Sequence, residues 1–120
     1  MNDRTKALAI PHGVKLQVAR RDSVKGWPCC VWCGKPAPTE NRLAFSNAHY
    51  ISRAQGGKGI TANILTLCPE DHRRYDATIH RTAMRAYFKA YLLRMHPFWS
   101  EDKLYYRKTE EAENESIGCL

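Results

Sequence analysis

The sequence predicts a small α+β domain flanked by helices. The chain has 120 residues, enough for one modest hydrophobic core. Two extended segments, at 43–52 and 60–67, are separated by a glycine-rich loop and followed by Pro69, a residue typical of a first helical turn. A Cys-x-x-Cys pair at 30–33 lies far in sequence from a third cysteine, Cys68, which suggests that the fold joins these two regions.

Helices are expected before and after the two extended segments. A short helix is predicted over 13–22, and a second begins at Pro69 and is interrupted near Thr78. A third is predicted over 81–95, because apolar residues recur there at helical spacing, and Pro97 ends it. The residues of this stripe are Met84, Tyr87, Phe88, Tyr91, Leu92 and Met95.

The composition indicates one folded domain between two polar ends. We expect residues 1–12 to be a flexible leader, 13–108 to form the domain with its helical C-terminal extension, and 109–120 to be a disordered acidic tail. The start of the chain lacks the apolar stretch of a signal peptide, and no run of about 18 apolar residues could span a membrane. A cytoplasmic protein is therefore expected.

The charge of the chain favours a polyanionic partner. Its formal net charge is +7, and four of its 12 acidic residues lie in the tail. The part before the tail, which carries all 19 lysines and arginines, is more basic still. Nucleic acid is the commonest partner of so basic a domain. The alternative is that these side chains only keep the surface soluble.

The cysteines predict a structural zinc site. Cys30 and Cys33, followed by glycine, form a pattern typical of a zinc knuckle, and Cys68 offers a third thiolate. On a helix beginning at Pro69, the side chain of Asp71 or of His72 returns to the side of Cys68 and could complete four ligands. The alternative is ordinary buried or redox-active cysteines. Cys29 is expected to be a spare buried residue, and Cys119 to be a free thiol.

Three further residues suggest hydrolytic chemistry: His49, Asn63 and His72. Hydrolysis of a phosphodiester at neutral pH needs a base for the attacking water and a cation to neutralise developing charge. The pKa of a histidine side chain suits the first task. An asparagine amide can hold a loop or orient the base by hydrogen bonding. A single histidine is more often structural, so only the combination carries this hypothesis; His12, His80 and His96 are expected to be structural or surface residues.

Two stretches of sequence carry a family resemblance. The stretch Ala48-His-Tyr-Ile-Ser-Arg-Ala-Gln-Gly-Gly57, followed by Asn63-Ile-Leu-Thr-Leu-Cys-Pro-Glu-Asp-His-Arg-Arg-Tyr-Asp76, resembles the phage-encoded, cysteine-containing HNH endonucleases. The approach to the cysteine pair through 19–22 is similar as well, so the resemblance covers about residues 14–77. It implies a ββα-metal (His-Me finger) core, in which a hairpin packs on a helix with one divalent cation between them.

The resemblance also implies residue roles. His49 corresponds to the general base, Asn63 to the motif asparagine, and His72 to a ligand of one catalytic cation: Mg²⁺, Mn²⁺ or Ni²⁺. The structural zinc ligands of the family correspond to Cys30, Cys33, Cys68 and Asp71.

The chain departs from the family pattern at two positions. Ala48 stands where many members carry Asp or His as a metal ligand, and Asp76, one helical turn after His72, could supply the missing ligand. Asp71 stands where cysteine is usual. Either Asp71 binds zinc, or His72 binds zinc and the catalytic cation then has one ligand fewer.

The loop at 53–59 and the following helix are expected to meet DNA phosphates. The cations concerned are Arg53, Lys58, Arg73 and Arg74, with Arg81 beyond them. The alternative is a solvated flexible loop.

The function expected from these features is metal-dependent hydrolysis of DNA phosphodiester bonds. The resemblance implies a phage or prophage protein in the host cytoplasm, with a terminase or another packaging protein as a possible partner. Two alternatives stay open: a non-catalytic, zinc-stapled nucleic-acid-binding module, and an adaptor that docks a partner through its aromatic C-terminal segment.

Overall fold

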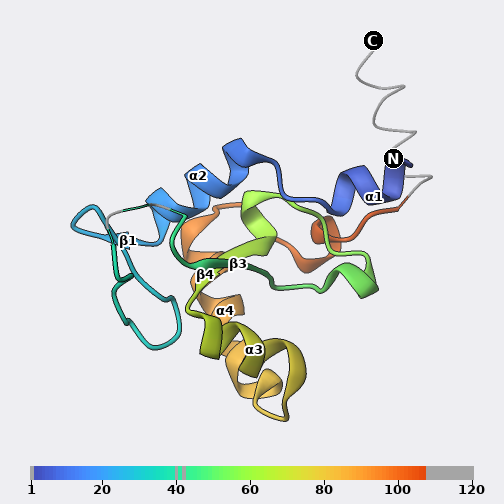
Figure 1. Ribbon diagram of the computed structural model, residues 1–120. Coiled ribbons are helices and arrows are strands. Elements are labelled where there is room, and N and C mark those ends of the chain that lie inside the picture. Colours follow the sequence, from blue (N-terminus) through green and yellow to red (C-terminus); the bar gives the residue numbers. More distant parts are fainter. Residues whose placement is uncertain (1, 40, 42, 108–120) are drawn as a thin grey trace.

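A two-stranded antiparallel hairpin occupies the middle of the computed structural model, which describes residues 2–39, 41 and 43–107 (Figure 1). Strand β3 (Ser46–His49) pairs with β4 (Ile64–Leu67), so that His49 lies opposite Ile64. All four residues of β4 are buried, which requires cover on both faces of the hairpin. The strands are shorter than the predicted segments 43–52 and 60–67, because the antiparallel pairing holds for only four residues on each side.

Helices cover the hairpin on opposite sides (Figure 1). Helix α2 (His12–Arg21) contacts β4, whereas α3 (Pro69–Ala77) contacts both strands and α4 (Arg81–Met95) packs against α3. As predicted, α3 begins at Pro69 and stops before Thr78, and α4 spans 81–95. A second hairpin of two short strands, β1 (Ser23–Val24) and β2 (Trp27–Pro28), leads from α2 into the cysteine pair. The structure is thus a small α+β fold, as expected.

A buried polar network joins α2 to the hairpin and to α4. The side chain of Asp22, which ends α2, accepts hydrogen bonds from Arg21, from the Thr66 amide (2.9 Å) and from the Tyr91 hydroxyl (2.5 Å). The Arg21 guanidinium also donates to the Thr61 and Ile64 carbonyls. Because a buried carboxylate needs such partners, this network fixes α2 against β4.

The N-terminal residues are more ordered than the sequence suggested. Residues 3–8, expected to belong to a flexible leader, form helix α1 (Asp3–Leu8). The Asn2 side chain caps this helix by accepting from the Thr5 amide (2.8 Å), and Leu8 is only 2% exposed. The side-chain cap stabilises the helix itself, and the buried Leu8 helps to anchor the segment on the domain.

The segment after α4 returns to the domain and packs on it. It contains the short 3₁₀ helix η3 (Glu101–Leu104), whose Leu104 is buried, and the Trp99 indole donates to the Ala62 carbonyl (2.8 Å). The acidic tail 109–120 and Cys119 lie outside the described residues. Within the described part of the chain, no helix combines the length and apolar character needed to cross a membrane.

Candidate functional site

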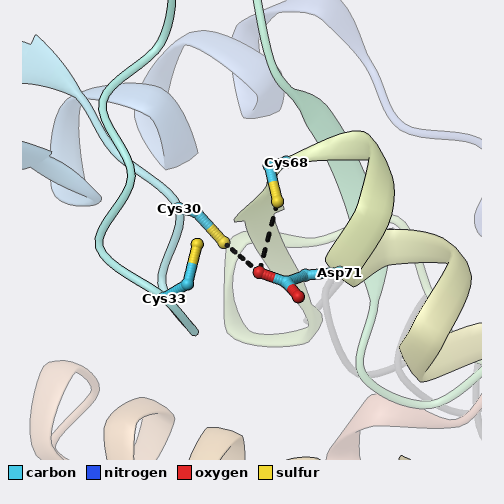
Figure 2. Close-up of side chains that lie close together, drawn as sticks. All are labelled: Cys30, Cys33, Cys68 and Asp71. Atoms are coloured by element: carbon cyan, nitrogen blue, oxygen red, sulfur yellow. Dashed lines mark hydrogen bonds between the residues drawn. The ribbon is translucent and has the colours of Figure 1, made fainter.

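Three cysteines and one aspartate from distant parts of the chain converge on one point (Figure 2). The ligand atoms of Cys30, Cys33, Cys68 and Asp71 all lie within 4.8 Å of one another. Asp71 Oδ2 accepts from the Cys30 thiol (3.3 Å) and from the Cys68 thiol (3.2 Å). This group, called the cysteine cluster below, could hold a metal ion.

The local backbone explains why these side chains meet. The Gly34 amide donates to the Cys30 carbonyl (2.9 Å), and Gly34 takes the left-handed φ of 76° that glycine allows and that turns the chain back after Cys33. The Val31 amide donates to the Thr66 carbonyl (3.0 Å), which fastens this turn to β4. Cys68 lies at the N-terminal boundary of α3, so Asp71 returns to its side within one turn.

Without a bound cation, the surroundings of the cysteine cluster favour neutral cysteine thiols and an ionised Asp71 carboxylate. Burial raises the pKa of the Cys30 thiol to about 12 and also raises the pKa of Cys68. Burial opposes ionisation of Asp71 as well, but hydrogen bonds from the three thiols and the charge of Arg74 outweigh it and lower the Asp71 pKa. Since metals bind thiolates, a bound cation would displace thiol protons.

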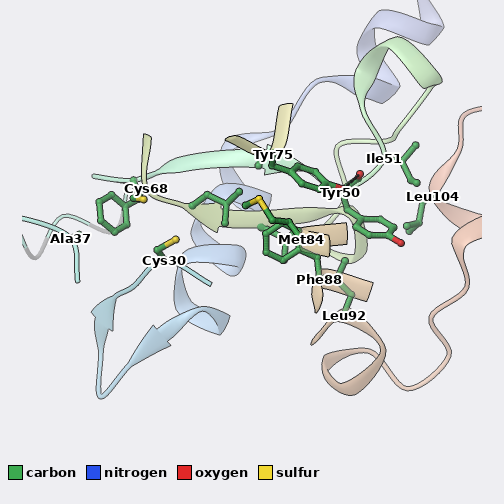
Figure 3. Packing of buried hydrophobic residues seen from close by; sticks show 14 residues of the cluster. Cys30, Ala37, Tyr50, Ile51, Cys68, Tyr75, Met84, Phe88, Leu92 and Leu104 are labelled. Carbon is green, nitrogen blue, oxygen red and sulfur yellow. Dashed lines mark hydrogen bonds between the residues drawn. The ribbon is translucent and has the colours of Figure 1, made fainter. Parts of the chain in front are cut away.

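The cysteine cluster is continuous with the hydrophobic core. Cys30 and Cys68 are buried and lie at one end of it, whereas Ile51 and Leu104 lie at the other (Figure 3). Cys29 stays outside the cluster; it is half-buried rather than buried as expected, and its thiol donates to the Trp27 carbonyl (3.4 Å). A bound ion would thus connect the end of the core to the chain segment that carries Cys30.

A separate cleft of about 650 Å³ contains the residues suggested for catalysis. His49, His72 and Asp76 line it together with Arg53 and Arg81. Asp71 and His72 are adjacent in sequence, yet Asp71 belongs to the cysteine cluster and His72 to this cleft, called the His49 cleft below. Of the two candidates for the fourth ligand, the structure therefore brings Asp71, and not His72, to the cysteines.

A hydrogen bond to one ring nitrogen of His49 holds the imidazole and distinguishes its two nitrogens. Its Nε2 lies 2.9 Å from the Leu8 carbonyl oxygen. Because a carbonyl only accepts, Nε2 carries the proton of the neutral ring and Nδ1 keeps the lone pair. Burial lowers the pKa of His49, the charge of Arg53 lowers it further, and the hydrogen bond to Leu8 and the charge of Asp76 only partly oppose this. The ring is therefore neutral at pH 7.

This lowered pKa makes folding stability depend on pH. The unfolded chain binds a proton at His49 more readily than the folded chain does, so the His49 contribution is complete above about pH 6.5 and is lost as the pH falls through the folded value. We expect urea denaturation to show a steeper loss of stability below pH 6.5 for the natural chain than for His49→Gln. The cysteine cluster is common to both proteins, so its own pH dependence cancels; parallel curves would contradict the expectation.

His72 and Asp76 form a pair along one side of α3. His72 Nε2 and Asp76 Oδ2 are 3.0 Å apart, and Asp76 Oδ1 lies 3.8 Å from the Arg81 guanidinium. The two side chains are 28% and 49% exposed, so solvent and small ions reach them. A histidine nitrogen and a carboxylate oxygen are ligands that a divalent cation such as Mn²⁺ or Ni²⁺ accepts.

Asn63 anchors the loop rather than the histidine. It is fully buried; its Oδ1 accepts from the Ile51 amide (2.7 Å), and its Nδ2 donates to the carbonyls of Ile51 (3.1 Å) and Lys58 (2.9 Å). None of these three bonds goes to His49. Asn63 therefore closes the ends of the loop that follows β3, which is one of the two roles the sequence left open.

We expect Asn63→Ala to cost about 2–4 kcal/mol of folding free energy, because it leaves buried backbone groups at Ile51 and Lys58 without their side-chain partner. Urea denaturation measures this. Asn41→Ala, which removes one exposed local bond to the Leu43 amide, is the matched control and should change stability by less than about 1 kcal/mol. Equal losses for the two variants would contradict the anchoring role.

The basic residues expected to bind DNA divide between two surfaces. Arg53 lines the His49 cleft, and Lys58 lies further along the same loop. Arg73 and Arg74 instead line a second, smaller cleft of about 280 Å³, and Arg74 also pairs with Asp71 Oδ1 at 2.8 Å.

Two parts of the His49 cleft could not be predicted from the sequence. These are Ile10, which lines the cleft, and the Leu8 carbonyl, which contacts His49. A backbone contact of this kind leaves no signal in side-chain patterns.

Comparisons with known proteins do not assign the chain to a family. No family model matches it, and no curated protein matches it.

Proposed function

We propose that the protein is a metal-dependent endonuclease of the HNH type, which hydrolyses DNA phosphodiester bonds with His49 as general base. The observation that carries the proposal is a neutral, half-buried His49 in one cleft with the His72–Asp76 pair and two arginines. Such a cleft combines a proton acceptor, a candidate cation site and positive charge for a phosphate.

In this proposal His49 takes a proton from the attacking water. The base must be unprotonated at neutral pH, and burial in the cleft favours that state. Arg53 and Arg81 line the same cleft and would hold the phosphate oxygens, because guanidinium groups match phosphate geometry. Positioning of water and phosphate then comes from side chains on the loop after β3, on α3 and on α4.

His72 and Asp76 are the candidate ligands of the catalytic cation, with Mg²⁺, Mn²⁺ or Ni²⁺ as candidates. A bound cation would supply charge neutralisation at the phosphate and the leaving oxygen. Ala48 is buried with no exposed surface, so it faces the core, and the carboxylate available in the cleft is that of Asp76. This supports Asp76 as the ligand that replaces the one missing at Ala48.

The cysteine cluster is proposed to hold a structural zinc ion. Three sulfur ligands favour zinc over magnesium or calcium, and three thiolates with one carboxylate complete the four ligands of a closed site. The free energy of binding such an ion would add to the folding free energy of the domain.

Cleavage of supercoiled plasmid tests the proposed function. Zinc-loaded protein should leave the plasmid intact in EDTA at a concentration that spares the cysteine cluster, and should nick or cut it when Mg²⁺, Mn²⁺ or Ni²⁺ is added. Failure to cleave with any of these ions, together with retained DNA affinity, would instead support a zinc-stapled DNA-binding module. Ala48, at a position where many of the nucleases that the sequence resembles carry a metal ligand, is the observation that favours this second function.

We expect Asp76→Asn to weaken Mn²⁺ binding to the zinc-loaded protein by at least about tenfold, because it removes a charged oxygen ligand beside His72. Isothermal titration calorimetry measures the affinity. Asp102→Asn, an exposed residue of η3 away from the cleft, is the control and should bind Mn²⁺ as the natural chain does. An unchanged affinity in Asp76→Asn would remove this residue from the cation site.

A further inference from the structure

The N-terminal segment, residues 3–10, lies directly against the His49 cleft. The Leu8 carbonyl contacts His49 Nε2 at 2.9 Å, and the Ala7 carbonyl accepts from the Gly59 amide at 3.0 Å. The Arg4 guanidinium donates to the Arg53 carbonyl at 3.3 Å. The segment is thus hydrogen-bonded both to the proposed base and to the loop that follows it.

The loop is shaped to accept this segment closely. A Cβ atom at Gly59 would lie 1.9 Å from the Ala9 carbonyl oxygen and 2.5 Å from its carbon, so only glycine allows the two backbones to touch. Leu8 is 2% exposed, and Ile10 lines the cleft itself. A fitted backbone contact, a buried anchor and a cleft-lining residue together indicate that the segment is part of the site.

We infer that the N-terminal segment is a positioning element for His49, which acts through the Leu8 carbonyl. A neutral imidazole exchanges between two tautomers and rotates about its side-chain bonds. A backbone acceptor on Nε2 selects one tautomer and one orientation, so that Nδ1 is the nitrogen that takes a proton. The role of this arrangement in catalysis rests on the proposed function, whereas the fixed tautomer depends only on the hydrogen bond to the Leu8 carbonyl.

Leu8 is a positioning residue in this arrangement, since it acts on the reaction only through His49. A segment that merely stabilised the fold would have no effect on the imidazole tautomer. An obstructing segment would lower the nuclease rate while in place. A purely stabilising segment is therefore distinguished from a positioning segment by the tautomer of the His49 ring, and an obstructing segment by the cleavage rate.

The full-length variant Gly59→Ala tests the inference, because its methyl group collides with Ala9 and must displace the segment from the loop. Gly13→Ala is the matched control, since a Cβ there meets nothing within 4 Å. Leu8→Ala, which removes the buried anchor but leaves the loop unchanged, is the second variant. Circular dichroism reports whether each protein is folded.

Nitrogen-15 NMR of the His49 ring at pH 8 gives the first readout, on zinc-loaded protein. The natural chain and Gly13→Ala should show a single tautomer with the proton on Nε2 and a protected ring N–H signal. Gly59→Ala and Leu8→Ala should lose that signal and move toward a mixture of tautomers. A proton on Nδ1 in the natural chain would overturn the inference without any variant, as would unchanged ring signals in a folded Gly59→Ala.

Plasmid cleavage gives the second readout. In Gly59→Ala, kcat should fall between about tenfold and a hundredfold while KM changes little, because the base is misplaced and DNA contacts remain. A faster rate would identify the segment as an obstruction and overturn the inference. If the natural chain does not cleave DNA but shows the fixed Nε2–H tautomer, the proposed function fails while the positioning of His49 stands.

Discussion

Replacing Cys30 by serine should leave a chain that binds no zinc and does not fold stably at room temperature. Zinc binding supplies about 10 kcal/mol or more of folding free energy in small zinc domains, which is comparable to the whole folding free energy of an ordinary domain. Cys30 is buried, and its thiol contacts Asp71 directly, so a serine hydroxyl would both remove a thiolate ligand and leave a polar group in the core. Metal analysis and far-UV circular dichroism measure the two effects.

Cys29→Ser is the matched control for this experiment. Cys29 is the neighbouring residue, but its thiol lies outside the cysteine cluster and bonds only to the Trp27 carbonyl among the described residues. This variant should bind one equivalent of zinc and unfold at the temperature of the natural chain. A folded Cys30→Ser protein without zinc, as stable as Cys29→Ser, would end the proposal of a structural zinc ion.

Substituting His49 by alanine should reduce DNA cleavage by about a hundredfold to ten-thousandfold, the range expected for loss of a general base. The variant should remain folded, because His49 is only half-buried and the loop is held by Asn63. It should also bind DNA as the natural chain does, since Arg53 and Arg81 are unchanged. Single-turnover cleavage of plasmid and a DNA-binding titration separate rate from affinity.

The control for His49→Ala is His12→Ala, an exposed histidine at the start of α2 that does not line the cleft. Its cleavage rate should equal that of the natural chain. An undiminished rate in His49→Ala would exclude this residue as the base. Equal loss in both variants would point to a general effect of histidine removal on the fold.

Helices α3 and α4 and the cysteine cluster followed from the sequence because their signals lie within short stretches of neighbouring residues. Pro69 marks the start of α3, and the apolar stripe of 81–95 marks α4 along its full length. The cluster could be predicted because Cys30 and Cys33 share one turn, whereas Cys68 and Asp71 share another. Which neighbour, Asp71 or His72, faces the cysteines required the orientation of α3 on the hairpin, which local sequence does not determine.

The features that could not be predicted depend on contacts between distant backbones. The extent of β3 depends on its partner, and pairing ends at His49 because β4 begins only at Ile64. Order in the N-terminal residues comes from one helix cap, one buried leucine and several carbonyl contacts. The sequence of this segment does not reveal these contacts, because its composition is that of a polar leader. The division of the arginines between two clefts likewise follows from the direction in which α3 presents Arg73 and Arg74.

One peptide bond joins the two sites, since Asp71 belongs to the cysteine cluster and His72 to the His49 cleft. The His72 amide donates to the Cys68 carbonyl at 2.9 Å and so closes the first turn of α3. An ion bound to Cys68 and Asp71 would hold this same turn, and with it the common frame of His72 and Asp76. Under the proposed function, loading of the cysteines with metal would thus also steady the groups that bind the catalytic cation, so that occupancy of one site affects the other.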